Sequence, residues 1–131
     1  STIKFLQDSL REVVVSGTGA GAFSGFPIEV SGKTGTGQVF GKNPNGSLKD
    51  DTSWFASFAP SNNPRYAVVM MVGQGGFGAS TSGVGVRQIY ETLYGVTGNK
   101  VVPGAALFPE GKPPTQLPKI SPATKPRETG K

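Results

Sequence analysis

The stretch Val30-Ser31-Gly32-Lys33-Thr34-Gly35-Thr36-Gly37 decides how the rest of this sequence is interpreted. It lies within a strand-like segment, so neighbouring side chains are expected on opposite faces. The lysine supplies a cation and the two threonines supply hydroxyl groups. Gly35 leaves a point where the backbone of a bound molecule can come close, because glycine has no Cβ. The stretch therefore predicts a polar binding site carried on a strand.

Charge is distributed unevenly along the 131 residues, which leave room for one domain at most. Residues 96–131 contain six lysines and arginines against two glutamates, and so carry +4 of the net charge of +5. Seven of the 11 prolines lie in the same stretch. The high isoelectric point is therefore a property of a basic, Pro-rich tail, which argues against a folded nucleic-acid-binding surface.

The composition excludes several classes of site. The sequence has no cysteine and no histidine, so disulfides, thiolate chemistry and zinc or most other transition-metal sites are not expected. The longest apolar run, residues 66–72, is far shorter than the ~20 residues that cross a bilayer. We recognise no signal peptide. We expect neither a metal nor another cofactor.

Two segments have the apolar spacing of helices. The first is capped by Ser1 or Thr2 and runs to about Val15, before a glycine-rich turn. The second opens at residue 81 or 82 and is ended by Gly95. The residues that share one apolar face are Ile3, Leu6, Leu10, Val13 and Val14 in the first helix and Val86, Ile89, Tyr90 and Leu93 in the second.

Three segments between these helices are predicted strands, at residues 28–40, 52–59 and 66–72. Turn-forming residues separate them at 43–46 and 60–64. Short turns between neighbouring strands favour an antiparallel sheet. The third strand is apolar on both faces, so we expect it to be a central strand covered on both sides.

These elements predict an α/β (α+β) fold class, with an antiparallel sheet portion of three strands flanked by N- and C-terminal helices. We expect one structured portion over residues 1–95 and a Pro/Lys-rich extended tail over 96–131, where no sustained period is present. Because the third strand is too hydrophobic for a sheet edge, we expect further strands to pair with it. The chain is therefore expected to be part of a larger fold.

The order of these features resembles the last third of a class B penicillin-binding protein, a peptidoglycan D,D-transpeptidase, over about residues 3–95. The resemblance implies a partial β-lactamase/transpeptidase-like fold. The tail with Leu117-Pro118-Lys119-Ile120 is similar to actinobacterial enzymes of the elongation type. The motifs that carry the resemblance are Gly32-Lys33-Thr34-Gly35-Thr36, Asp51-Thr52-Ser53-Trp54-Phe55-Ala56-Ser57-Phe58-Ala59-Pro60 and Asn63-Pro64-Arg65-Tyr66-Ala67-Val68.

The family implies a role for each residue of the motif. Lys33 is expected to place a positive charge in the cleft, near the reacting groups. Thr34 and Thr36 are expected to hold a carboxylate through their hydroxyls, and the backbone N–H of Thr36 to supply half of an oxyanion hole. Gly35 lets the substrate backbone lie close. The resemblance thus implies catalytic roles for Lys33 and Thr36 and substrate binding by Thr34, Gly35 and Thr36.

Two motifs of the family lack convincing matches. The nucleophile motif is Ser-x-x-Lys and the second motif is Ser-x-Asn, and both precede Lys-Thr-Gly in the family. Ser1-Thr2-Ile3-Lys4 and Ser61-Asn62-Asn63 fit only the letters, since Ser1 is expected to cap a helix and Ser61 to lie in a turn. We therefore expect the attacking serine on an upstream segment, which would be the partner of this chain.

The resemblance implies what the complete protein does. It would cross-link peptidoglycan stem peptides through an acyl-enzyme and would be acylated by β-lactam antibiotics. The chain alone is expected to be inactive. The family implies a location at the extracytoplasmic face of the bacterial cell membrane, with a membrane anchor only upstream of this chain.

Two other functions stay open. The chain could belong to a non-catalytic penicillin-sensing or assembly module built on the same fold. It could also be a Gly-rich, basic nucleic-acid binder, with Trp54, Phe55 and Phe58 stacking on bases. The charge distribution argues against nucleic acid as a partner, because residues 96–131 carry +4 of the net charge of +5 and leave little on the folded portion. Aromatic residues on an alternating strand more often form a core.

Overall fold

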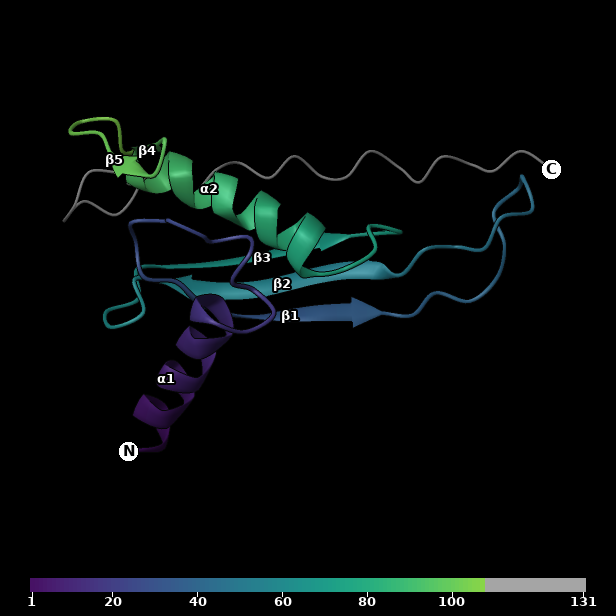
Figure 1. Cartoon of the computed structure of the whole chain (residues 1–131), viewed down its shortest axis with the longest axis horizontal. Coiled ribbons are helices and arrows are strands. Elements are labelled where there is room, and N and C mark those ends of the chain that lie inside the picture. Colours follow the sequence, from purple (N-terminus) through teal and green to yellow (C-terminus); the bar gives the residue numbers. More distant parts are fainter. Residues whose placement is uncertain (108–131) are drawn as a thin grey trace, which may run out of the picture.

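A computed structural model of the chain describes residues 1–107, which form a three-stranded antiparallel sheet with helices before and after it (Figure 1). This arrangement confirms the predicted α/β (α+β) fold class. The elements are α1 (Thr2–Val15), β1 (Ser31–Gly37), β2 (Thr52–Ala59), β3 (Tyr66–Val72), the π-helical turn η1 (Ala79–Gly83), α2 (Val84–Tyr94), β4 (Val96–Thr97) and β5 (Lys100–Val101).

Helix α1 has the predicted bounds, because both of its ends are capped. The Ser1 hydroxyl accepts a hydrogen bond from the Lys4 N–H at 3.4 Å. At the other end, the N–H groups of Ser16 and Gly17 both donate to the Glu12 carbonyl. The helix extends away from the start of β1 rather than lying across the sheet (Figure 1). Within residues 1–107 no helix is long and apolar enough to cross a membrane.

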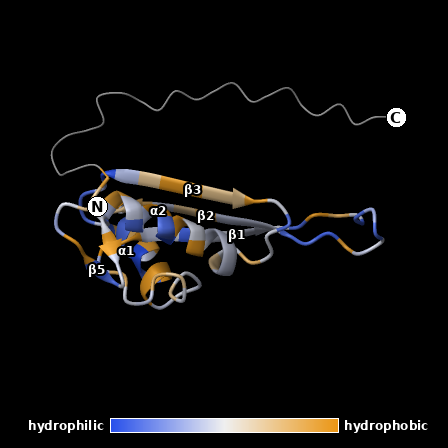
Figure 2. Cartoon of the chain, turned by 90° about the horizontal axis from the view of Figure 1, so that it is seen from above, coloured by the Kyte–Doolittle hydropathy of each residue, from blue (hydrophilic) through white to orange (hydrophobic). Residues whose placement is uncertain are grey.

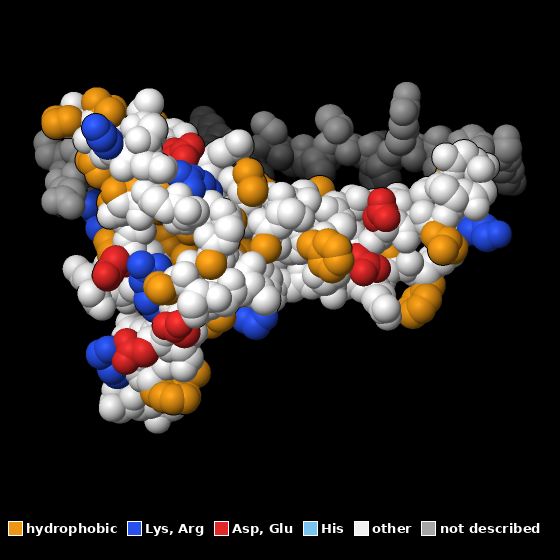
Figure 3. Space-filling model, in the orientation of Figure 1, with side chains coloured by type: hydrophobic (Ala, Val, Ile, Leu, Met, Phe, Trp, Pro, Cys, Tyr) orange, Lys and Arg blue, Asp and Glu red, His pale blue; other side chains and the backbone are white. Residues whose placement is uncertain are grey.

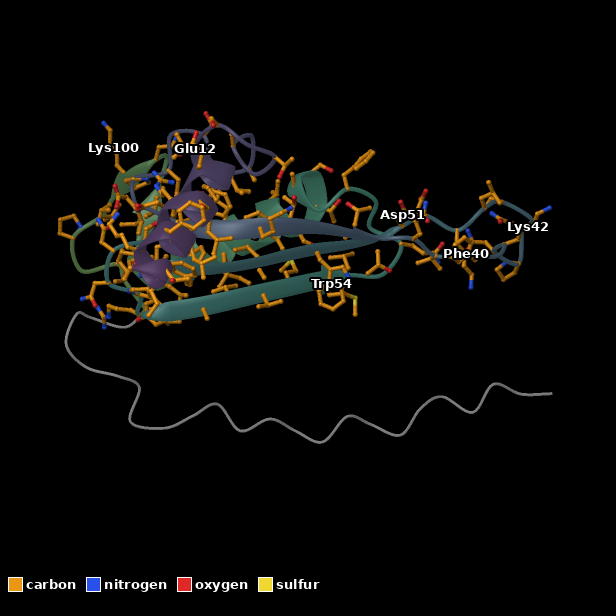
Figure 4. The ribbon with its side chains drawn as sticks, turned by 90° about the horizontal axis from the view of Figure 1, so that it is seen from below. Glu12, Phe40, Lys42, Asp51, Trp54 and Lys100 are labelled. Atoms are coloured by element: carbon orange, nitrogen blue, oxygen red, sulfur yellow. The ribbon has the colours of Figure 1, made fainter. Side chains whose placement is uncertain are left out.

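The two faces of the sheet differ in what covers them. Strand β2 is central and pairs antiparallel with β1 and β3. Helix α2 packs on the face that carries Phe55 (Figure 2). The opposite face carries Trp54, Val69 and Met71, which are 43%, 61% and 54% exposed. Trp54 lies on the side away from the helices (Figure 4). One apolar sheet face is therefore open to solvent within the described chain.

Within residues 1–107, the segment 66–72 is not a central strand covered on both sides, and the prediction that further strands pair with it stays a prediction. Strand β3 is an edge strand, and its half-buried and exposed residues alternate along its length. An apolar run shows that both faces can be buried, but it does not show which segment buries them. The exposed side chains of β3 are therefore of the kind expected in a strand that is covered on both faces. The described residues cover only one of these faces.

Phe55 is at the centre of the core, with 0% of its surface exposed. Its ring lies 5.5 Å from the ring of Phe23, centroid to centroid. A Cβ added at Gly32 would approach the ring to 2.8 Å, and one at Gly19 to 3.3 Å. Because these glycines have no side chain, β1 and the turn after α1 can both lie directly against the ring. The core prediction for the aromatic residues of this strand is confirmed for Phe55 but is wrong for Trp54 within residues 1–107, because Trp54 is exposed and Phe58 is half-buried.

Polar pairs join the sheet to the C-terminal helical segment. The Ser53 hydroxyl donates to the Ser82 hydroxyl at 2.8 Å, so two buried hydroxyls satisfy each other. The hydroxyls of Ser57 and Tyr90 lie 3.0 Å apart. Burial of its phenol raises the pKa of Tyr90 above the ordinary value, while the hydrogen bond to Ser57 acts in the opposite direction.

A hairpin arm, residues 38–51, connects β1 to β2 and extends beyond the sheet (Figure 1). Its tip is held by its own hydrogen bonds, including one from the Asn43 side chain to the Ser47 hydroxyl at 3.0 Å. Phe40 on this arm is 86% exposed. Figure 4 shows Phe40 and Lys42 on the arm, away from the body of the sheet.

Residues 96–107 are structured where an extended tail was expected. Strands β4 and β5 form a small antiparallel hairpin, and Gly98 and Asn99 in its turn both have positive φ. The Leu107 N–H donates to the Thr92 carbonyl at 3.2 Å, which holds this stretch on α2. The boundary at residue 95 stays a prediction, and the rest of the expected tail lies outside the described residues.

Phe55→Ala should be far more costly than the same change at Phe40. We expect Phe55→Ala to lower the free energy of unfolding by about 3–5 kcal/mol, because it leaves a cavity in the core. Phe40→Ala should change it by less than about 0.5 kcal/mol, because the side chain is exposed. Urea denaturation of the two variants measures the difference, and equal denaturation midpoints would contradict this placement of the core.

Gly78→Ala and Gly73→Ala form a second matched pair. A Cβ at Gly78 would lie 2.5 Å from the Trp54 carbonyl oxygen and 2.6 Å from that of Gly35, whereas nothing lies within 4 Å of one at Gly73. We expect Gly78→Ala to cost about 1–3 kcal/mol of stability, because backbone must move. Gly73→Ala should stay within about 0.5 kcal/mol of the parent chain in the same denaturation experiment. Similar losses for both variants would show that the close approach at Gly78 is wrong.

Candidate functional site

Strand β1 carries all four predicted site residues on an open edge of the sheet. Its only strand partner within residues 1–107 is β2, so no strand of the described chain pairs with its other edge. Lys33 and Thr36 are exposed, and Thr34 and Gly35 are half-buried. The register pairs Lys33 with Ala56 and Gly35 with Trp54, which places Lys33 on the uncovered face of the sheet.

The side chain of Lys33 curls around the edge of β1. Lys33 and Thr34 start on opposite faces of the strand. Even so, the Lys33 ammonium donates to the Thr34 carbonyl oxygen at 2.9 Å and reaches the Thr34 hydroxyl at 3.4 Å. No carboxylate in residues 1–107 pairs with this ammonium. The open edge therefore presents a cation and a hydroxyl side by side.

The Thr34 hydroxyl has a second neighbour, which is a hydroxyl from a distant part of the chain. The hydroxyl of Thr18, in the turn after α1, lies 2.8 Å from the Thr34 hydroxyl, and either atom can be the donor. No local sequence pattern predicts this contact. The signal available was the sequence Gly17-Thr18-Gly19, which places one hydroxyl residue between two glycines. The pairing itself depends on how the end of α1 docks against β1.

Other atoms of the protein lie close to Gly35, although the sequence predicts an open point there. A Cβ there would lie 3.1 Å from the Cβ of Trp54, its cross-strand partner. The segment that contains Gly78 approaches the Gly35 backbone as well. A side chain at position 35 would therefore be restricted by the protein itself. The expected close approach of a substrate to Gly35 stays a prediction.

The two serine-containing stretches that fit family motifs by letters have structural roles. Ser1 caps α1, and Lys4 pairs with Asp8 on the helix surface. Ser61 is buried and accepts a hydrogen bond from the Ser31 hydroxyl at 2.9 Å. Asn62 donates to the Glu29 carboxylate at 3.1 Å. These contacts confirm the cap and turn interpretations, and they do not place either serine beside Lys33.

An apolar groove lies between α1 and the sheet. Its volume is about 420 Å³, and it is on the side of α1 where the helix leaves its predicted apolar face uncovered. Figure 3 shows α1 as a lobe that projects away from the sheet. Within residues 1–107 no cluster of acidic side chains could hold a metal ion. The groove is lined by Ile3, Leu6, Gln7, Leu10, Phe58 and Pro64.

Comparison with known sequences supports one family. The family profile described as "Penicillin binding protein transpeptidase domain" matches residues 1–92. The Peptidoglycan D,D-transpeptidase FtsI homolog of Mesostigma viride is 37% identical over 98 residues, which is 71% of this chain and 16% of that protein. The Peptidoglycan D,D-transpeptidase MrdA of Haemophilus influenzae is 33% identical over 84 residues, or 58% of this chain and 13% of that protein.

Solved structures agree with the sequence relatives. PBP2 of Pseudomonas aeruginosa, in complex with WCK 5153, superposes with a TM-score of 0.61 at 27% identity and covers 74% of this chain and 20% of that one. A penicillin-binding protein (PBP2) of Helicobacter pylori gives 0.52 at 28% identity, over 66% and 16% of the two chains. The chain thus spans about a fifth or less of the proteins it matches. By profile, sequence and fold, the chain belongs to the penicillin-binding protein transpeptidase domain family, in its class B branch.

Proposed function

We propose that this chain forms the Lys-Thr-Gly wall of a serine D,D-transpeptidase site, and that the attacking serine lies on a preceding part of the same domain. The observation that carries the proposal is the open edge of β1. There the Lys33 ammonium and the Thr34 hydroxyl lie together, with no carboxylate partner in the described chain. A cation beside a hydroxyl suits an anionic ligand such as the carboxylate of a peptide terminus or of a β-lactam.

The backbone of β1 supports the same proposal. The Thr34 carbonyl accepts a hydrogen bond from the Lys33 ammonium, which lies at the free side of the strand. Backbone groups of residues two apart on an antiparallel strand point the same way. The N–H of Thr36 therefore faces the free edge and is available to an oxyanion. An extended peptide can also add to this edge through main-chain hydrogen bonds.

The surfaces left open fit a larger domain. The exposed face with Trp54, Val69 and Met71 and the groove beside α1 are apolar, and patches of this kind are usually covered in stable proteins. The relatives are several times longer than this chain. The preceding part of the domain, with its Ser-x-x-Lys and Ser-x-Asn motifs, is the proposed occupant of these surfaces and the partner that completes the site.

The proposed reaction is acyl transfer between peptidoglycan stem peptides. The serine hydroxyl attacks the carbonyl carbon between the two D-Ala residues, the peptide bond breaks, and the terminal D-Ala leaves with a proton on its amine. An amine of a neighbouring stem then attacks the carbonyl carbon of the acyl-enzyme ester and forms the new peptide bond, the ester C–O bond breaks, and a proton from that amine restores the serine hydroxyl. A β-lactam acylates the same serine through opening of its ring.

The residues of β1 share this work. Lys33 supplies positive charge beside the attacking serine and the acyl donor. Thr34 and Thr36 hold the carboxylate through their hydroxyls, and the Thr36 N–H stabilises the oxyanion. Gly35 has no side chain, so the substrate backbone can pass close to the strand. The proposed location is the extracytoplasmic face of the cell membrane, with the anchor outside this chain, and the actinobacterial elongation type stays a prediction.

Labelling with a fluorescent penicillin tests the division of the site. The complete transpeptidase domain should give a covalent band on a denaturing gel, and the 131-residue chain alone should give none, because it lacks the attacking serine. Labelling of the chain alone would show that the nucleophile lies within it. Labelling of the complete domain without any cross-linked peptide product would favour the penicillin-sensing alternative over the transpeptidase.

Lys33→Ala in the complete domain tests the residue at the centre of the proposal. We expect its acylation rate constant to fall by about 100-fold or more, as for the loss of one group that stabilises the transition state. Lys42→Ala is the matched control, because Lys42 is an exposed lysine on the hairpin arm. It should label at the parent rate. Equal rates for the parent and the Lys33→Ala variant would remove Lys33 from the mechanism.

A further inference from the structure

The contact between Thr18 and Thr34 points to a role for Thr18 in carboxylate recognition. We propose that Thr18 is a positioning residue that directs the hydroxyl proton of Thr34 outward, toward the carboxylate of the substrate. The inference rests on the proposed function, because it concerns the same site. It adds a residue from outside the Lys-Thr-Gly strand, 16 positions earlier in the chain, to the parts that determine ligand binding.

Backbone contacts on both sides fix the place of Thr18. The Gly17 N–H donates to the Glu12 carbonyl at 3.1 Å, and the Gly19 N–H donates to the Val13 carbonyl at 2.9 Å. A Cβ at Gly17 would lie 2.8 Å from the Cα of Val13, so no other residue can take this path without movement. The turn is thus attached to the end of α1, and it presents the Thr18 hydroxyl to β1.

The donors and acceptors around Thr34 explain what this hydroxyl does. A threonine hydroxyl has one proton to donate and can accept two hydrogen bonds. The Lys33 ammonium, which can only donate, lies 3.4 Å from the Thr34 oxygen, and the Thr18 oxygen lies 2.8 Å from it. When Thr18 donates, both accepting positions of Thr34 are used. The Thr34 proton is then free to point to a ligand at the open edge.

The opposite orientation has the opposite result. If Thr34 donates to Thr18, no hydroxyl proton of Thr34 remains for a ligand. A carboxylate can only accept hydrogen bonds, so its arrival selects the orientation in which Thr18 donates. Thr18 therefore favours ligands with an anionic acceptor at this position. A ligand whose carboxylate is masked as an ester gains much less from the Thr18 hydroxyl, because its charge is lost.

Acylation kinetics of the complete transpeptidase domain test this role. The ligands are benzylpenicillin, which has a free carboxylate, and its methyl ester. Thr18→Val removes the hydroxyl with little change of shape, and Thr18→Ser keeps it. Thr97→Val is the matched control, because Thr97 is an exposed threonine in β4, outside the proposed site. A melting temperature equal to that of the parent domain shows that each variant is folded.

We expect Thr18→Val to lower the second-order rate constant for benzylpenicillin by about tenfold, the effect of one lost hydrogen bond to a charged system. The rate constant for the methyl ester should fall by no more than about twofold, because the ester carbonyl is an uncharged acceptor. Thr18→Ser and Thr97→Val should stay within about twofold of the parent domain for both ligands. In a Thr34→Val background, Thr18→Val should cause no further loss, because Thr18 acts through Thr34.

The remaining outcomes separate this inference from the function on which it rests. If the parent domain is acylated and Thr18→Val reacts with benzylpenicillin at the parent rate, the role of Thr18 is refuted and the transpeptidase proposal stands. Equal slowing with the acid and the ester would assign Thr18 a purely structural role and also refute the inference. A parent domain that neither ligand acylates would overturn both proposals.

Discussion

The packing around the Phe55 ring is the constraint on which the rest of the structure depends. Phe55 lies on the central strand, and three glycines from separate segments come close to its ring. Added Cβ atoms would lie 3.3 Å from the ring at Gly19, 2.8 Å at Gly32 and 3.4 Å at Gly83. The ring therefore joins the turn after α1, the start of β1 and the π-helical turn η1. The residues beside each glycine, Thr18 and Lys33 among them, are placed by this contact.

The uncovered surfaces follow from the same arrangement. Helix α2 and η1 use the Phe55 face of the sheet, and α1 packs at the start of β1. A polar edge and an apolar face are then left beside each other, the first with Lys33 and Thr34 and the second with Trp54 and Met71. This combination is what one wall of a cleft between two parts of a domain requires. Under the proposed function, the second part is the preceding portion of the transpeptidase domain.

Local signals predicted most of the fold, and contacts between distant segments explain the rest. The Ser1 cap and the left-handed Gly95 set the helix ends. Alternating apolar residues predicted β2, and a continuous apolar run predicted β3, both with their observed bounds. The edge position of β3 depends on which segments are present, so its composition alone does not determine it. The hairpin at Gly98 and Asn99 has a recognisable turn sequence. Because many prolines follow it, the sequence predicts these residues as part of the extended tail.

Family motifs singled out Lys33 and Thr34 as candidate site residues, because a short motif keeps its spacing whatever surrounds it. The Thr18 contact could not be predicted in this way, since it depends on the docking of α1 and not on any local pattern.

The exposed edges of the sheet also affect how the chain behaves when it is produced alone. Within the described part of the chain, the outer edges of β1 and β3 have no strand partner, so their N–H and C=O groups can pair with the same strands of another copy. At high concentration the chain alone should aggregate through these edges. Its solubility should depend on the preceding part of the domain, which is proposed to cover them.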